Sequence, residues 1–140
     1  MCQFVSWVER RGKVYFLTSE QLESERGRKW IQEQKVSPDD LCGHGTIRLW
    51  HRIDAGDGVD KECGDFSTPD NFPTPIAEAV KAGKFNSFPI PAGLLSKPLD
   101  EDYVAKLKPL DNDYRAKCKA LREDYWALFL IPENRAPKWR

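Results

Sequence analysis

Cys2 is the residue of this chain that is best suited to act as a nucleophile, because it directly follows Met1. Removal of Met1 leaves a thiol beside a free α-amine, with unperturbed pKa values of about 8.5 and about 8. Such a pair can act as nucleophile and base within one residue, as in N-terminal-nucleophile enzymes. His44 and Asp65 are the candidate supporting groups. The alternative interpretation is a small residue that opens a strand, since no oxyanion-hole motif accompanies Cys2.

Both histidines and two of the four cysteines lie close together in the sequence, as Cys42, His44, His51 and Cys63. Two thiolates and two imidazoles can hold Zn²⁺ tetrahedrally. Their spacing differs from that of standard zinc fingers, and a helix would separate the two histidines by two turns, or about 10 Å. We therefore expect no cofactor, with structural zinc at these four residues as the alternative.

Residues 53–70 concentrate negative charge, with six acidic residues and one basic residue. The carboxylates resemble a set of Ca²⁺ ligands, but the spacing of a calcium-binding loop is absent. Long loops in compact domains are commonly functional, so we expect residues 54–72 to form the contact surface together with exposed faces of the repeats in the last third of the chain. The two phenylalanines of this segment either anchor it on the core or are exposed anchors for a partner. The expected contact residues are Arg48, Asp57, Asp60, Phe66, Asp70 and Phe72.

The N-terminal third predicts a β-hairpin followed by a helix. Residues 3–9 alternate, and a turn at Gly12 leads to a second β-rich run ending at Leu17. Thr18 and Gln21 fit a capping box, which predicts a helix over residues 19–34 that Gly27 weakens. Further helices are expected over residues 44–53 and 74–82. Residues 84–95 fit a third short strand and a turn.

The last third repeats with a period of eleven residues, and the units at 98–108 and 109–119 agree at eight of eleven positions. Eleven residues make about three helical turns, so the Leu, Tyr and tenth positions form a core-facing stripe. Pro109 must interrupt the helix, which predicts one helix over 100–107 and another over 110–130. We expect a single domain over 1–131 and a loose tail over 132–140, in which Trp139 alone is a candidate for docking.

The amino-acid composition and charge of the chain restrict the partners that it can be expected to bind. The 140 residues are 40% hydrophobic, and 22 basic residues balance 22 acidic ones. This balance makes nucleic acid an unlikely partner, since such binding needs a basic surface. No apolar run reaches the roughly 20 residues of a membrane span, so no membrane partner is expected. Charges at Glu9, Arg10 and Arg11 come too early for a signal peptide, so we expect a cytoplasmic protein. The elements together predict an α+β fold, with a small antiparallel sheet covered by several helices.

Three features together resemble small bacteriophage and prophage proteins. They are the Met-Cys-x-Phe opening with its hairpin, the Gly43-His44-Gly45-Thr46-Ile47-Arg48 segment, and the tyrosine-bearing repeats. In that family we expect Gly-His-Gly-Ala-Ile-Arg at the second feature. The resemblance implies a setting in the cytoplasm of an infected bacterium, and it carries no assigned activity. We therefore expect a non-catalytic accessory protein that binds a host or viral protein. An enzyme using Cys2 and a zinc-stabilised binding module are the alternatives.

Overall fold

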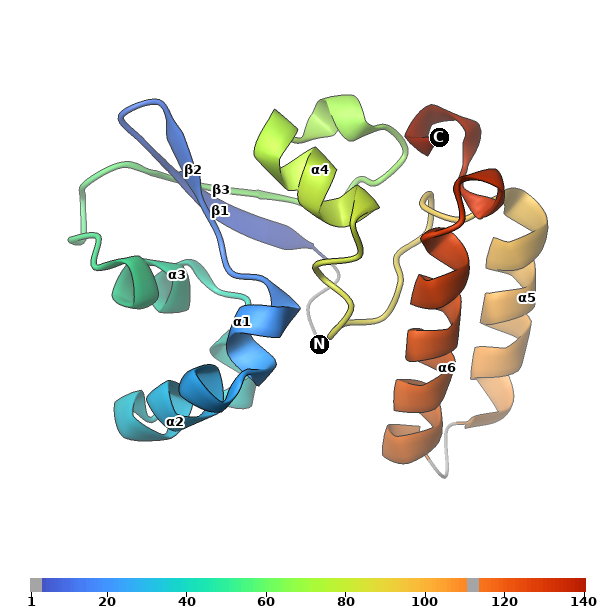
Figure 1. Ribbon diagram of the computed structural model, residues 1–140, viewed down its shortest axis with the longest axis horizontal. Helices are drawn as coiled ribbons and strands as arrows, with labels where there is room; N and C mark the ends of the chain where they lie inside the picture. Colours follow the sequence, from blue (N-terminus) through green and yellow to red (C-terminus); the bar gives the residue numbers. More distant parts are fainter. Residues whose placement is uncertain (1–3, 111–113) are drawn as a thin grey trace.

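The computed structural model describes residues 4–110 and 114–140, and its centre is an antiparallel sheet with the strand order β2-β1-β3 (Figure 1). The strands and helices of the described residues are, in chain order, β1 (Val5–Arg10), β2 (Lys13–Tyr15), α1 (Ser19–Glu23), α2 (Glu25–Gln34), α3 (His44–His51), β3 (Val59–Cys63), α4 (Thr74–Lys81), α5 (Lys97–Leu107) and α6 (Tyr114–Phe129). Short 3₁₀ turns lie between them. The predicted α+β fold, a small antiparallel sheet covered by helices, is confirmed.

The two faces of β1 pack against different layers because its side chains alternate. Val5 and Trp7 join the larger core, which includes α4, the segment 85–95 and the inner sides of α5 and α6. Val8 joins a smaller core with Leu17 and with residues of α1 and α3. The sheet therefore lies between two sets of helices, as Figure 1 shows.

The third strand lies elsewhere than predicted. Val59–Cys63 pairs antiparallel with β1 from within the segment expected to be a loop. Residues 84–95 form turns in place of a strand, with an isolated bridge between Leu95 and Arg135. Their apolar side chains are buried because the segment crosses the core. The buried residues are Phe85, Phe88, Ile90, Leu94 and Leu95.

The helix expected over 19–34 is two helices, although its predicted start is confirmed. Thr18 and Gln21 form the capping box of α1. Ser24 ends α1 and caps α2, accepting a hydrogen bond from the backbone N–H of Gly27. Gly27 is required here, since a Cβ at this position would stand 1.9 Å from the carbonyl oxygen of Gln21. The glycine therefore permits the close contact between the two helices.

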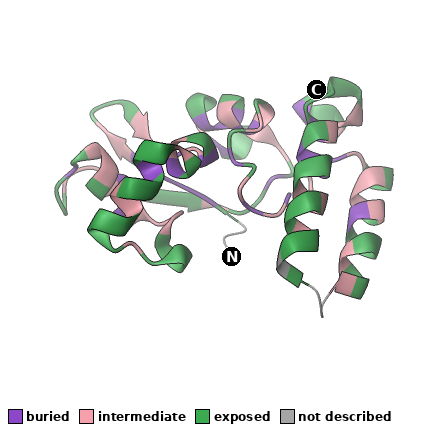
Figure 2. Ribbon diagram, turned by 60° about the horizontal axis from the view of Figure 1, so that its bottom comes forward, coloured by how far each residue is buried: buried purple, intermediate pink, exposed green. Residues whose placement is uncertain are grey.

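The C-terminal repeats form a helical hairpin whose stripe is only partly buried. Tyr103 on α5 and Tyr125 on α6 are buried and in contact, whereas Tyr114 is 45% exposed. Figure 2 shows much of α6 exposed. Pro109 lies in a 3₁₀ turn after α5, as its missing N–H requires. The predicted start of the second helix at 110 cannot be compared fully, because residues 111–113 lie outside the described part.

The prediction that the C-terminal tail is loose is wrong. Residues 132–140 form two 3₁₀ turns, and the indole of Trp139 is fully buried and donates to the carbonyl of Phe66 at 2.8 Å. Arg135 donates to the carbonyls of Phe129 and Lys81. The tail therefore closes the larger core. In the described residues, no helix is both long and apolar enough to cross a membrane.

Candidate functional site

The polar residues of α3 are engaged by backbone carbonyls. His44 donates from Nε2 to the carbonyl of Lys61 at 2.7 Å, which lies on the edge strand β3. His51 donates from Nε2 to the carbonyl of Phe16 at 2.9 Å, and its ring stands edge-on to Tyr15. The two imidazoles thus fasten opposite ends of α3 to different segments of the chain.

Arg48 holds the acidic segment in place from the middle of the same helix. Its guanidinium donates to the carbonyls of Asp54 at 2.7 Å and Asp57 at 2.5 Å, and pairs with the carboxylate of Asp60 at 2.8 Å. Arg10 pairs with the carboxylate of Asp57 at 2.6 Å. Two of the acidic residues expected to face a partner are therefore neutralised within the chain. Arg48 itself is largely buried, with 13% of its side chain exposed, and is poorly placed for contact.

The remaining expected contact residues divide into anchors and turn-formers. Phe66 and Phe72 are 1% and 7% exposed, so they anchor the segment on the core, and the exposed-anchor interpretation is wrong. Asp70 is exposed, and its backbone N–H donates to the Thr68 hydroxyl at 3.3 Å. Of the six expected contact residues, only the acidic ones reach the surface.

The candidate catalytic residues are not assembled by the described part of the chain. Cys2 lies outside the described residues, and the hypothesis of a Cys2 nucleophile stays a prediction. His44 and Asp65 line two separate surface hollows. Hydrogen bonds from Ser67, first of all from its hydroxyl, and from Asn71 lower the pKa of Asp65. Asp65 is therefore a carboxylate held in a local turn.

The four candidate zinc ligands are not brought together either. Within residues 4–110 and 114–140, no group of three or more His, Cys, Asp or Glu side chains is arranged to hold a metal ion. Both histidines use Nε2 to bind carbonyls. Cys63 contacts the backbone of Asp65, and Cys42 faces a different part of the molecule, described next.

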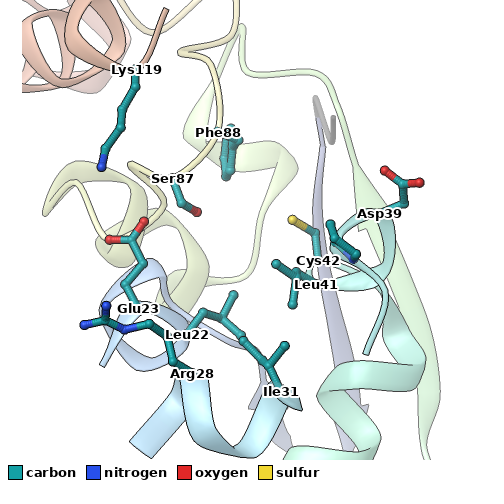
Figure 3. Close-up of a pocket in the computed structure, with 11 residues that line it drawn as sticks. Leu22, Glu23, Arg28, Ile31, Asp39, Leu41, Cys42, Ser87, Phe88 and Lys119 are labelled. Atoms are coloured by element: carbon teal, nitrogen blue, oxygen red, sulfur yellow. The ribbon is translucent and has the colours of Figure 1, made fainter. Parts of the chain in front are cut away.

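A groove of about 550 Å³ separates the α1–α2 pair from the turn at Phe88 and from α6 (Figure 3). Its floor is apolar, with Leu22 and Phe88 buried and Ile31 and Leu41 half-buried. We call this feature the interhelical groove. Its lining residues are Leu22, Glu23, Arg28, Ile31, Pro38, Asp39, Leu41, Cys42, Ser87, Phe88 and Lys119.

Charged side chains mark the two ends of the interhelical groove. Figure 3 shows Arg28, Glu23 and Lys119 on one side and Asp39 on the other. Arg28 and Lys119 are exposed, and neither has an acidic partner within 4 Å among the described residues. One end of the groove therefore has a net positive charge available to an occupant, and the other end has a negative charge.

Sequence reasoning did not identify this groove. In the sequence, Leu22 and Ile31 belong to the helix predicted over residues 19–34, and Cys42 is a candidate zinc ligand. No local pattern connects residues 22–42 with Phe88 and Lys119, because the groove depends on how the two halves of the chain meet.

Comparison with known proteins does not identify the function of the groove, since no protein family, curated protein or solved structure matches the chain.

Proposed function

We propose that this protein is a small non-catalytic accessory factor that binds a host or viral protein through the interhelical groove. The resemblance of the sequence to small bacteriophage proteins supports the choice of partner and a setting in the bacterial cytoplasm. The engagement of His44, Arg48 and His51 in structural hydrogen bonds supports a binding role, because these are the groups a catalytic site would otherwise use.

The observation that carries the proposal is the combination of an apolar floor with charged ends. At about 550 Å³ the groove lies within the range of typical binding clefts. Burying an apolar side chain against Leu22, Ile31 and Leu41 would remove apolar surface from water on both partners. Such burial contributes about 25 cal/mol per Å².

The charges define the chemistry of the occupant. Arg28 and Lys119 lie at one end, and neither pairs with an acidic side chain of the described residues, so an acidic residue of the occupant is favoured there. Asp39 at the other end favours a basic residue. The occupant is thus a peptide segment with a large apolar side chain between an acidic and a basic residue. Electrostatic complementarity of this kind fixes orientation more than it adds affinity.

The proposal can be tested by selection from a displayed library of random peptides. The wild-type protein should enrich peptides that carry an acidic residue within a few positions of an aliphatic or aromatic one. The R28E/K119E double variant reverses both unpaired charges and should bind the selected peptides at least about tenfold more weakly. The K13E/K138E variant reverses two exposed charges away from the groove and should bind as the wild type does.

Two results would overturn the proposal. The first is a library selection in which the wild type enriches no sequence over the R28E/K119E variant. The second is equal loss of binding in R28E/K119E and K13E/K138E, because a general charge effect would then explain the binding. Circular dichroism of all variants controls for folding.

A further inference from the structure

A narrow cavity lies directly behind the interhelical groove. It shares five lining residues with the groove, which are Leu22, Leu41, Cys42, Ser87 and Phe88. Its volume is about 20 Å³. A space of that size holds one water-sized group. The cavity is therefore a small extension at the bottom of the groove.

Ser6 lines this cavity, and its hydroxyl has no hydrogen-bond partner among the residues that the structure describes. The residue is 5% exposed, and its Oγ makes no hydrogen bond within the described part of the chain. The alternation of β1 places Ser6 on the same face as Val8, toward α1 and α3. Buried hydroxyls are almost always hydrogen-bonded, so this one indicates a missing partner.

The hydroxyl of Ser87 also lines the cavity and can still donate a hydrogen bond. Ser19 donates from Oγ to the Ser87 hydroxyl at 2.7 Å and accepts from the Ser87 backbone N–H at 2.9 Å. The proton of the Ser87 hydroxyl is then left for another acceptor. Among the described residues, no charged side chain lines the cavity, so these residues offer no counter-ion to a charged group. A neutral group that both donates and accepts fits this environment best.

We propose that the cavity receives the hydroxyl of a phenol, so that the apolar anchor of the bound peptide is a tyrosine. This inference rests on the proposed function and names the side chain that the groove selects. The ring lies against Leu22, Leu41 and Phe88, and its hydroxyl hydrogen-bonds to Ser6. A phenol has an apolar ring, which matches the apolar floor of the groove, and a polar hydroxyl, which matches the cavity. A phenylalanine in its place would leave Ser6 unpartnered.

The test uses two small probes, p-cresol and toluene, which differ by one hydroxyl. Each is titrated into the ¹⁵N-labelled protein, and Kd values are taken from the amide shifts of groove residues. The wild type should prefer p-cresol by about tenfold, which one buried hydrogen bond can supply. In Ser6→Ala the preference should fall below about twofold. Ser67→Ala, at an exposed serine, should keep the wild-type preference.

A stability measurement supplies the second readout. If the Ser6 hydroxyl is unpartnered in the free protein, Ser6→Ala should leave the Tm unchanged or raise it. A lower Tm for Ser6→Ala together with no preference for p-cresol would mean that the cavity holds a buried water only, and this would overturn the inference. A preference for p-cresol that survives Ser6→Ala would overturn it as well. If the binding of the selected peptides still depended on Arg28 and Lys119, the proposed function would remain supported.

Discussion

His44, Arg48 and His51 follow one another along α3, and each donates to a backbone carbonyl of another segment. At the residue scale, their polarity therefore stabilises the packing of α3 on the sheet and on the acidic segment. Residues of the same types also suit metal or catalytic sites, so sequence alone left several interpretations open. In the structure, all three side chains contact backbone carbonyls.

Arg48→Met should lower the free energy of unfolding by about 1.5–3 kcal/mol, because hydrogen bonds to charged groups contribute on that scale. Most of the loss comes from the carbonyls of Asp54 and Asp57, since the carboxylate of Asp60 is half exposed. Arg52→Met is the matched control and should change stability by less than about 0.5 kcal/mol, because Arg52 is exposed. Urea denaturation followed by circular dichroism measures both. Equal effects of the two substitutions would refute the role of Arg48.

Asp102 should make stability depend on pH at the acidic end. Hydrogen bonds, first from Tyr125 and then from Lys106, lower its pKa from 3.8. A lowered folded-state pKa contributes stability above 3.8, and that stability is lost as the pH falls through the folded value. The difference in unfolding free energy between wild type and Asp102→Asn should thus be larger at neutral pH than well below 3.8. A difference that is constant with pH would contradict this account.

At the scale of elements, the sequence predicted features set by neighbouring residues better than features that depend on long-range contacts. The capping box at Thr18 involves residues three apart, so the start of α1 could be predicted. β3 could not be predicted, because Val59–Cys63 is largely exposed and lacks apolar alternation. Its position depends on backbone pairing with β1 and on the contacts of Arg48 and His44. The segment 84–95 resembled a strand in sequence because it is rich in apolar residues. In the structure these residues are buried, but they lie in turns.

Gly27 and Gly45 allow a test of packing against helix propensity. Propensity predicts that alanine stabilises a helix at either site, by up to about 1 kcal/mol. Gly45→Ala should do so by about 0.5–1 kcal/mol, because a Cβ there has nothing within 4 Å. Gly27→Ala should instead destabilise by about 1–3 kcal/mol, because its Cβ would clash with the backbone of α1. Thermal unfolding of both variants gives the signs, and stabilisation by Gly27→Ala would show that α1 and α2 are not in close contact.

At the scale of the whole molecule, the tail and the groove depend on contacts between distant parts of the chain. Trp139 reaches Phe66 across 73 positions, and the interhelical groove combines α1 and α2 with α6. Sequence periodicity identified the helices that form these features but not the way they meet. The candidate site therefore had to be found in the structure, whereas the fold class and most helices did not.

Trp139→Ala should lower the free energy of unfolding by about 3–5 kcal/mol, the usual cost of removing a buried aromatic side chain. The loss is a large fraction of the about 5–15 kcal/mol that holds a domain of this kind together. Lys138→Ala, at the adjacent exposed position, should change it by less than about 0.5 kcal/mol. Denaturation monitored by circular dichroism compares them. If the two variants were equally stable, the tail would not be part of the core.

The central claim is that the interhelical groove is the site of protein binding, and mapping a bound peptide tests it most directly. The ¹⁵N-labelled protein is titrated with the tightest peptide from the library selection. We predict the largest amide shifts at Leu22, Ile31, Leu41 and Phe88, with affinity at least about tenfold lower in R28E/K119E. Largest shifts in the acidic segment 54–63, or unchanged affinity in R28E/K119E, would contradict the account.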